Sequence, residues 1–127
     1  MSEYRVLLVD DEEELVATLA ERLEYRDFLA QYAISGPAAL RMLREQTFDV
    51  VVIDLKLPGM SGEELLQTIG AAYPHLPVLM VTGHGSGTPE AGEKPAGAYD
   101  LLPKPIDISE LVTKMTDAIK AHGLKQK

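Results

Sequence analysis

Acidic, hydroxyl and basic side chains stand at the ends of short apolar runs, where together they could handle a phosphoryl group. They are Asp10, Asp11, Asp54, Thr82 and Lys104. Lys104 lies between two prolines, which is not typical of a lysine on a solvated face. The other interpretation of Asp10 and Asp11 is that they only cap the helix that follows, because aspartate is a preferred N-cap residue. Taken as a set, these residues favour a chemical site.

Carboxylates that converge on one point repel one another, and a bound dication removes that cost. Mg²⁺ suits such a site because it takes hard oxygen ligands, keeps several waters and works beside phosphates. Mn²⁺ would accept the same ligands. We expect Asp11 and Asp54 to bind the ion directly and Asp10 to act largely through water. The backbone carbonyl of Lys56 would supply a further oxygen.

Asp54 would then be both a metal ligand and a nucleophile, because an aspartate carboxylate can form an acyl phosphate. Phosphoryl transfer needs alignment and neutralisation of the phosphoryl oxygens more than it needs covalent help. The metal ion would bind one oxygen, the Lys104 ammonium a second and the Thr82 hydroxyl a third. The N-terminus of the helix after Asp11 would add a favourable dipole.

Five apolar, strand-like segments alternate with segments of helical periodicity. The expected strands cover residues 5–10, 28–33, 49–54, 78–82 and 98–102. The expected helices cover residues 12–25, 36–45, 61–72 and a last segment after Asp107. In the first helix, Leu15, Leu19 and Leu23 form the expected inward stripe, with Val16 and Ala20 beside it. In the third, Ser61 and Glu64 predict a capping box. This alternation predicts a parallel sheet covered on both faces, with its crevice at the carboxyl ends of the strands.

A further helix is expected between the last two strands, over Ser86–Ala96, but its composition is poor for a helix. It contains Gly87, Pro89, Gly92 and Pro95 and has no apolar stripe. Glycine and proline inside a helix cost about 1 and 3 kcal/mol relative to alanine. We therefore predict that this helix is short, distorted or mobile.

Length and composition indicate one globular domain, and the absence of cysteine fits a reducing compartment. The chain has 127 residues, of which 46% are hydrophobic and 25% charged, and it contains no cysteine. We expect a domain over residues 1–123 and a frayed tail over 124–127. The first residues do not resemble a secretory signal, and no apolar stretch approaches the roughly 20 residues of a spanning helix. A cytoplasmic location is expected. The net charge of −8 argues against binding nucleic acid or anionic lipid.

Four fragments of the chain resemble the response-regulator receiver family, and the resemblance covers essentially the whole sequence. The fragments are VLLVDDE, VVIDLKLPGMSG, VLMVTGHG and GAYDLLPKP. The resemblance implies a flavodoxin-like (βα)5 fold with a doubly wound parallel sheet and the strand order 2-1-3-4-5. It further implies metal-binding acids at Asp10 and Asp11, a phosphoacceptor at Asp54, a hydroxyl switch at Thr82, a phosphate-binding lysine at Lys104 and a cis bond before Pro105.

The resemblance also implies partners, namely a sensor histidine kinase or a phosphotransfer protein as phosphoryl donor. The sequence names no output: the chain is either a stand-alone receiver or a piece of a longer regulator, and a homodimer is compatible with it. One position departs from the family. Many members carry an aromatic switch residue three positions before the site lysine, where this chain has Leu101. Tyr99, two residues earlier, would lie on the same strand face and could partly replace that ring.

Three other functions compete with the phosphoacceptor switch. A pseudo-receiver, which is never phosphorylated and acts as a protein-interaction module, is favoured by Leu101 and by the unusual 86–96 segment. A flavin-binding module is disfavoured because the acidic run after the first strand would repel a phosphate. An aspartyl phosphatase would need an acid two residues after the nucleophile, where this chain has Lys56. We therefore expect no enzyme beyond self-phosphorylation and slow hydrolysis of the acyl phosphate.

Overall fold

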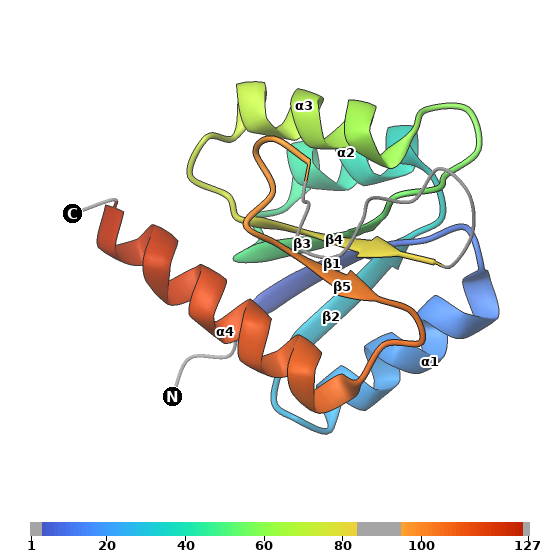
Figure 1. Ribbon diagram of the computed structural model, residues 1–127, viewed down its shortest axis with the longest axis vertical. Coiled ribbons are helices and arrows are strands. Elements are labelled where there is room, and N and C mark those ends of the chain that lie inside the picture. Colours follow the sequence, from blue (N-terminus) through green and yellow to red (C-terminus); the bar gives the residue numbers. More distant parts are fainter. Residues whose placement is uncertain (1–3, 84–94, 126–127) are drawn as a thin grey trace.

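The computed structural model describes residues 4–83 and 95–125, which form one parallel sheet with helices on both faces (Figure 1). The strands are β1 (Arg5–Val9), β2 (Leu29–Ala33), β3 (Val50–Asp54), β4 (Val78–Thr82) and β5 (Asp100–Pro103). All pairs are parallel and the order is β2-β1-β3-β4-β5, which confirms the expected doubly wound sheet. The helices of the described part are α1 (Glu13–Glu24), α2 (Gly36–Glu45), α3 (Gly62–Ala72) and α4 (Ile108–Lys125).

Most of the predicted helix over 86–96 falls in residues 84–94, which lie outside the described residues. The prediction that this helix is short or distorted therefore stays a prediction. None of the helices in the described ranges is long and apolar enough to cross a membrane.

Two hydrophobic layers hold the helices against the sheet. The layer under α1 and α4 takes Val6 and Leu8 from β1, and the layer under α2 and α3 takes Leu7 and Val9 from the same strand. Successive side chains of a strand point to opposite faces, so a strand buried on both faces must be apolar at every position. This explains why β1, β3 and β4 are apolar except at one end, where they carry Arg5, Asp54 and Thr82. Figure 1 shows α2 and α3 on one face and α1 and α4 on the other.

The inward face of α1 is centred on the side of the predicted stripe where Val16 and Ala20 lie. Val16, Ala20 and Leu23 are buried, Leu19 is partly buried, and Leu15 is 49% exposed. Positions 16, 20 and 23 are spaced for one helical face, and that face meets the sheet. The helix is therefore rotated by about one residue from the predicted stripe, because its packing depends on how the chain leaves β1.

The N-terminus of α3 is closely fitted to the end of β3. The Ser61 hydroxyl accepts the Glu64 N–H at 3.1 Å, and the Glu64 carboxylate accepts the Ser61 N–H at 2.9 Å, which confirms the predicted capping box. The Gly62 N–H donates to the Leu55 carbonyl at 3.0 Å, so the first turn lies directly on the backbone that follows Asp54. These contacts fix the loop between β3 and α3.

Candidate functional site

Two buried aspartates mark the carboxyl edge of the sheet. Asp10 follows β1 directly and Asp54 is the last residue of β3, and these residues are only 7% and 6% exposed. The neighbours of β1 lie on opposite sides of it, β2 on one and β3 on the other, so the chain changes direction in the sheet here. Such switch points form the ligand crevice of doubly wound sheets. Because the two strands are adjacent, Asp10 and Asp54 lie at the same crevice.

Lys104 reaches the crevice from beyond β5 and pairs with three carboxylates. Its Nζ lies 2.9 Å from Asp54 Oδ2, 3.0 Å from Glu12 Oε1 and 3.3 Å from Asp10 Oδ2. Burial lowers the pKa of Lys104, but the hydrogen bonds to Asp54 and Glu12 and the charge of Asp10 outweigh this and raise the pKa well above its usual value. Lys104 therefore carries its positive charge at neutral pH.

Thr82 lies at the carboxyl end of β4, and its backbone binds the residue that follows β5. Thr82 ends β4 and is 8% exposed. Its carbonyl accepts the Lys104 N–H at 2.7 Å, so the start of the lysine's loop is fixed to the end of β4. The peptide bond between Lys104 and Pro105 is cis. Asp54 is held similarly, because its Oδ1 accepts the Lys56 N–H at 3.1 Å.

The acidic cluster of the crevice has a different membership from the one expected. Carboxylate oxygens of Asp10, Glu12 and Asp54 all lie within 4.8 Å of one another, while Asp11 is exposed and is not in this group. Glu12 was not among the residues chosen from the sequence. The available signal was its place directly after two aspartates at the start of a helix, but a run of acids there is equally typical of a solvated first turn.

Asp10 does not act as a helix cap in the usual sense. The residue before α1 is Glu12, whose side chain makes no capping hydrogen bond. The Asp10 carboxylate accepts the Glu12 N–H at 2.9 Å, two residues ahead. Burial raises the pKa of Asp10 above its ordinary value of 3.8, and the nearby Asp54 charge adds to this, although the hydrogen bond from Glu12 and the charge of Lys104 work in the opposite direction.

We expect the substitution Asp10→Asn to stabilise the metal-free protein at neutral pH. The asparagine oxygen can still accept the Glu12 N–H, and the charge that burial disfavours is gone. Because the folded-state pKa is raised, the cost of the Asp10 charge is present above that pKa and disappears as the pH falls towards 3.8. The gain should be largest at neutral pH, where the Asp10 carboxylate of the wild type is charged.

Urea denaturation in the presence of EDTA, over a series of pH values, measures this effect. Asp11→Asn is the matched control, since Asp11 is exposed. A stabilisation of Asp10→Asn that does not shrink as the medium becomes acidic would contradict the explanation.

Leu101 and Tyr99 do not share a face, which corrects the expectation from the sequence. Leu101 packs on the layer under α2 and α3, whereas Tyr99 packs on the layer under α1 and α4. The Tyr99 ring meets the His122 ring edge-on, with centroids 6.2 Å apart. Tyr99 precedes β5, so the strict alternation of a strand does not extend to it. Tyr99 is therefore not placed to stand in for a ring at Leu101.

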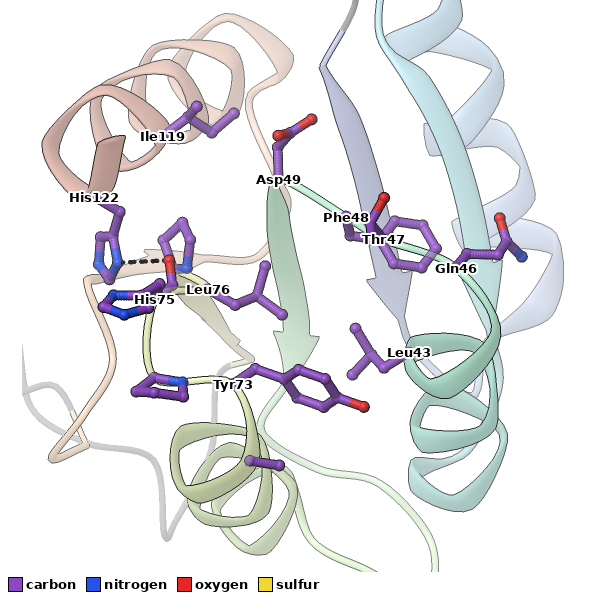
Figure 2. Close-up of a pocket in the computed structure, with 13 residues that line it drawn as sticks. Leu43, Gln46, Thr47, Phe48, Asp49, Tyr73, His75, Leu76, Ile119 and His122 are labelled. Atoms are coloured by element: carbon purple, nitrogen blue, oxygen red, sulfur yellow. Dashed lines mark hydrogen bonds between the residues drawn. The ribbon is translucent and has the colours of Figure 1, made fainter. Parts of the chain in front are cut away.

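A hollow of about 460 Å³ lies at the opposite, amino edge of the sheet (Figure 2). Residues just before β3 and β4, such as Phe48, Asp49 and Leu76, line it. Figure 2 shows His122 of α4 reaching over it, where its Nδ1 lies 3.1 Å from the His75 carbonyl oxygen. The hollow contains none of the predicted site residues, and we assign it no part in the chemistry.

A doubly wound sheet with this strand order and an acidic crevice facing one lysine is the arrangement of receiver domains. The family model described as "Response regulator receiver domain" matches residues 6–116. The chain therefore belongs to the response regulator receiver domain family.

Known proteins similar to the chain agree with this membership. A putative NtrX-like response regulator of Rickettsia conorii is 34% identical over 128 positions, which cover 99% of this chain and 27% of that protein. The response regulator protein FleR of Pseudomonas aeruginosa is 36% identical over 124 positions, 96% of this chain and 25% of that protein. The chain thus spans about a quarter of the length of these relatives.

Solved structures share the fold. The receiver domain protein from Clostridium thermocellum superposes with a TM-score of 0.87 and 30% identity, covering 95% of this chain and 98% of that one. A CheY-like receiver domain protein from Methanospirillum hungatei gives a TM-score of 0.87 and 27% identity, covering 98% of this chain and 99% of that one.

Proposed function

We propose that this domain is a phosphoacceptor signalling switch in which Asp54 takes a phosphoryl group from a histidine kinase or a phosphotransfer protein. The contact between Asp54 Oδ2 and the Lys104 ammonium, at 2.9 Å in a buried crevice, carries the proposal. In the reaction a carboxylate oxygen of Asp54 forms a bond to phosphorus, the bond from phosphorus to the donor nitrogen breaks, and the donor imidazole leaves. An acyl phosphate on Asp54 results.

The residues around Asp54 have distinct roles in this proposal. The Lys104 ammonium turns from the Asp54 carboxylate to an oxygen of the phosphoryl group and neutralises its charge. The Thr82 hydroxyl, at the end of the neighbouring strand, donates to a second oxygen and so reports the phosphorylated state. The Lys56 N–H keeps Asp54 oriented through its bond to Oδ1. At Leu101 the switch repacks a leucine where other receivers move an aromatic ring.

The crevice also fits a Mg²⁺ ion. Carboxylate oxygens from Asp10, Glu12 and Asp54 lie within 4.8 Å of one another, and hard oxygen donors gathered so closely suit a small dication. The ligands that we propose are Asp54 of this cluster and the Lys56 carbonyl, with Asp10 acting through water. Asp11 is the further proposed ligand, although its carboxylate is exposed and lies outside the cluster. Mn²⁺ would be accepted as well. When bound, the ion supplies positive charge that offsets the carboxylates and the phosphoryl oxygens.

The proposal extends to the bounds of the domain, its location and the protein in which it works. The domain covers residues 1–123, with 124–127 as a tail, and acts in the cytoplasm, where a chain without cysteine fits the reducing conditions. Because the relatives are about four times as long, we propose that the domain works within a longer regulator that carries an output domain. It catalyses only its own phosphorylation and slow hydrolysis, since Lys56 stands where a phosphatase would need an acid.

Asp54→Asn is expected to abolish phosphorylation. Incubated with acetyl phosphate and Mg²⁺, the wild-type protein should gain the mass of one phosphoryl group, which intact-protein mass spectrometry detects. Asp117→Asn, an exposed change on α4, serves as the matched control and should gain the same mass. If the wild type gains no mass, and beryllofluoride causes no spectral change that depends on Asp54, the protein-interaction module without phosphorylation becomes the better account.

A further inference from the structure

One of the three carboxylates around Lys104 approaches from the solvent side. The side chains of Asp54 and Asp10 are 8% and 10% exposed, whereas that of Glu12 is 61% exposed. Glu12 nevertheless lies as close to the ammonium as Asp54 does, at 3.0 Å against 2.9 Å. Glu12 therefore holds the lysine from the mouth of the crevice, where a phosphoryl donor must enter.

The backbone of Glu12 is fixed on both sides. Its N–H donates to Asp10 Oδ1 at 2.9 Å, and its carbonyl accepts the Val16 N–H at 3.0 Å, which begins the hydrogen bonding of α1. The residue is thus anchored to the buried aspartate at one end and to the helix at the other. Its side chain starts from a defined point beside the crevice, in contrast to an acid on a loose loop.

The lysine has a limited number of donors to share. An ammonium carries three N–H groups, and three carboxylates lie within 3.3 Å of Nζ. A phosphoryl group on Asp54 replaces the Asp54 carboxylate as a partner and brings more acceptor oxygens than that carboxylate had. An N–H of Lys104 that donates to Glu12 is then not available to the phosphoryl oxygens.

We propose that Glu12 is a positioning residue that competes with the phosphoryl group for the Lys104 ammonium. This inference rests on the proposed function of Asp54. In the resting protein Glu12 holds the ammonium from the entrance of the crevice. This competition weakens the retention of a phosphoryl group, so Glu12 shortens the life of the phosphorylated state.

Glu12→Gln tests the proposal, because glutamine keeps the length of the side chain and removes its charge. Glu14→Gln is the matched control: Glu14 is exposed in the first turn of α1, so the helix loses the same charge. Each variant and the wild type are titrated with beryllofluoride, a mimic of the phosphoryl group, at a Mg²⁺ concentration that saturates each protein. Affinity is measured by calorimetry.

The expected result is that Glu12→Gln binds beryllofluoride about two- to five-fold more tightly than the wild type, the range for losing one exposed ion pair. Glu14→Gln should match the wild type. In a Lys104→Met background the effect of Glu12→Gln should vanish, because the two residues act as a pair. Equal or weaker binding by Glu12→Gln, or an effect that persists without Lys104, overturns the proposal.

A second measurement needs neither metal nor phosphoryl mimic. The NMR signal of the Lys104 ammonium in the metal-free protein should move in Glu12→Gln and stay in place in Glu14→Gln; a signal unmoved in both overturns the proposal. If the wild type fails to bind beryllofluoride through Asp54, the proposed function fails and this inference with it. If the wild type binds and Glu12→Gln is unchanged, the role of Glu12 alone is wrong.

Discussion

Lys104→Met is expected to destabilise the metal-free protein at neutral pH, and Mg²⁺ is expected to restore much of the loss. Without the ammonium, the carboxylates of Asp10 and Asp54 face each other in a crevice where both are less than a tenth exposed. Removing one partner of a largely buried ion pair costs about 3–5 kcal/mol. The Lys104 side chain is itself 20% exposed, so the lower end of this range applies.

Chemical denaturation of the wild type and of Lys104→Met, each with EDTA and with Mg²⁺, measures the effect. A cation that binds only the folded state stabilises it by mass action, and the variant offers that cation a more negative crevice. The gain in free energy of unfolding from EDTA to Mg²⁺ should therefore be larger for Lys104→Met than for the wild type. Lys120→Met, an exposed change on α4, is the control for the loss of one positive charge. Equal stability of the two variants in EDTA would contradict the prediction.

Gly62→Ala is expected to destabilise the fold by about 1–3 kcal/mol, as when an atom is forced into a packed region. A Cβ at this position would press on the Asp54 carbonyl oxygen and lie 2.8 Å from Leu55 Cα. Both of these are backbone atoms, which cannot rotate away as the end of a side chain could. To relieve the contact, α3 or the end of β3 must shift. Because Asp54 is on that segment, we also expect weaker beryllofluoride binding.

Gly70→Ala provides the comparison within the same helix. A Cβ there meets nothing within 4 Å, and position 70 is exposed. Alanine in a helix interior is favoured over glycine by about 0.5–1 kcal/mol, so this variant should be more stable than the wild type. Urea midpoints for the two variants therefore move in opposite directions. If Gly62→Ala were as stable as Gly70→Ala, the close approach of α3 to β3 would not be a feature of the folded protein.

The strands were predictable because burial on both faces leaves a clear mark on a sequence, whereas their order was implied by the resemblance to the receiver family. The run Val50–Ile53 of β3 is apolar at every position, and five strand-like segments separated by helical segments allow few topologies. The positions of Asp10, Asp54, Thr82 and Lys104 followed from where each strand ends in the sequence. The capping box at Ser61 was predictable for a similar reason, since its two hydrogen bonds form between residues three apart.

The rotation of helices and the partners of long side chains were harder to predict from the sequence. Leu15 was expected inside and is exposed, because helical spacing defines a stripe only to within about one residue. Tyr99 was expected on the face of Leu101, but the alternation that supports this holds only within a strand. Both errors concern how a helix or a residue beside a strand is oriented against the rest of the fold. Residues nearby in the sequence do not decide that orientation.

The sequence by itself determined the family, the sheet and the set of side chains at its carboxyl edge, because these depend on local periodicity and on residue type at strand ends. Only the tertiary structure decided which of the acids after β1 meet Lys104: Asp10 and Glu12 do. Among consecutive acids, Asp10 is buried, Asp11 is exposed and Glu12 reaches the ammonium at 3.0 Å. The physical reason is that the path from β1 into α1 sets the direction of each side chain, while the lysine arrives from a loop more than ninety residues away.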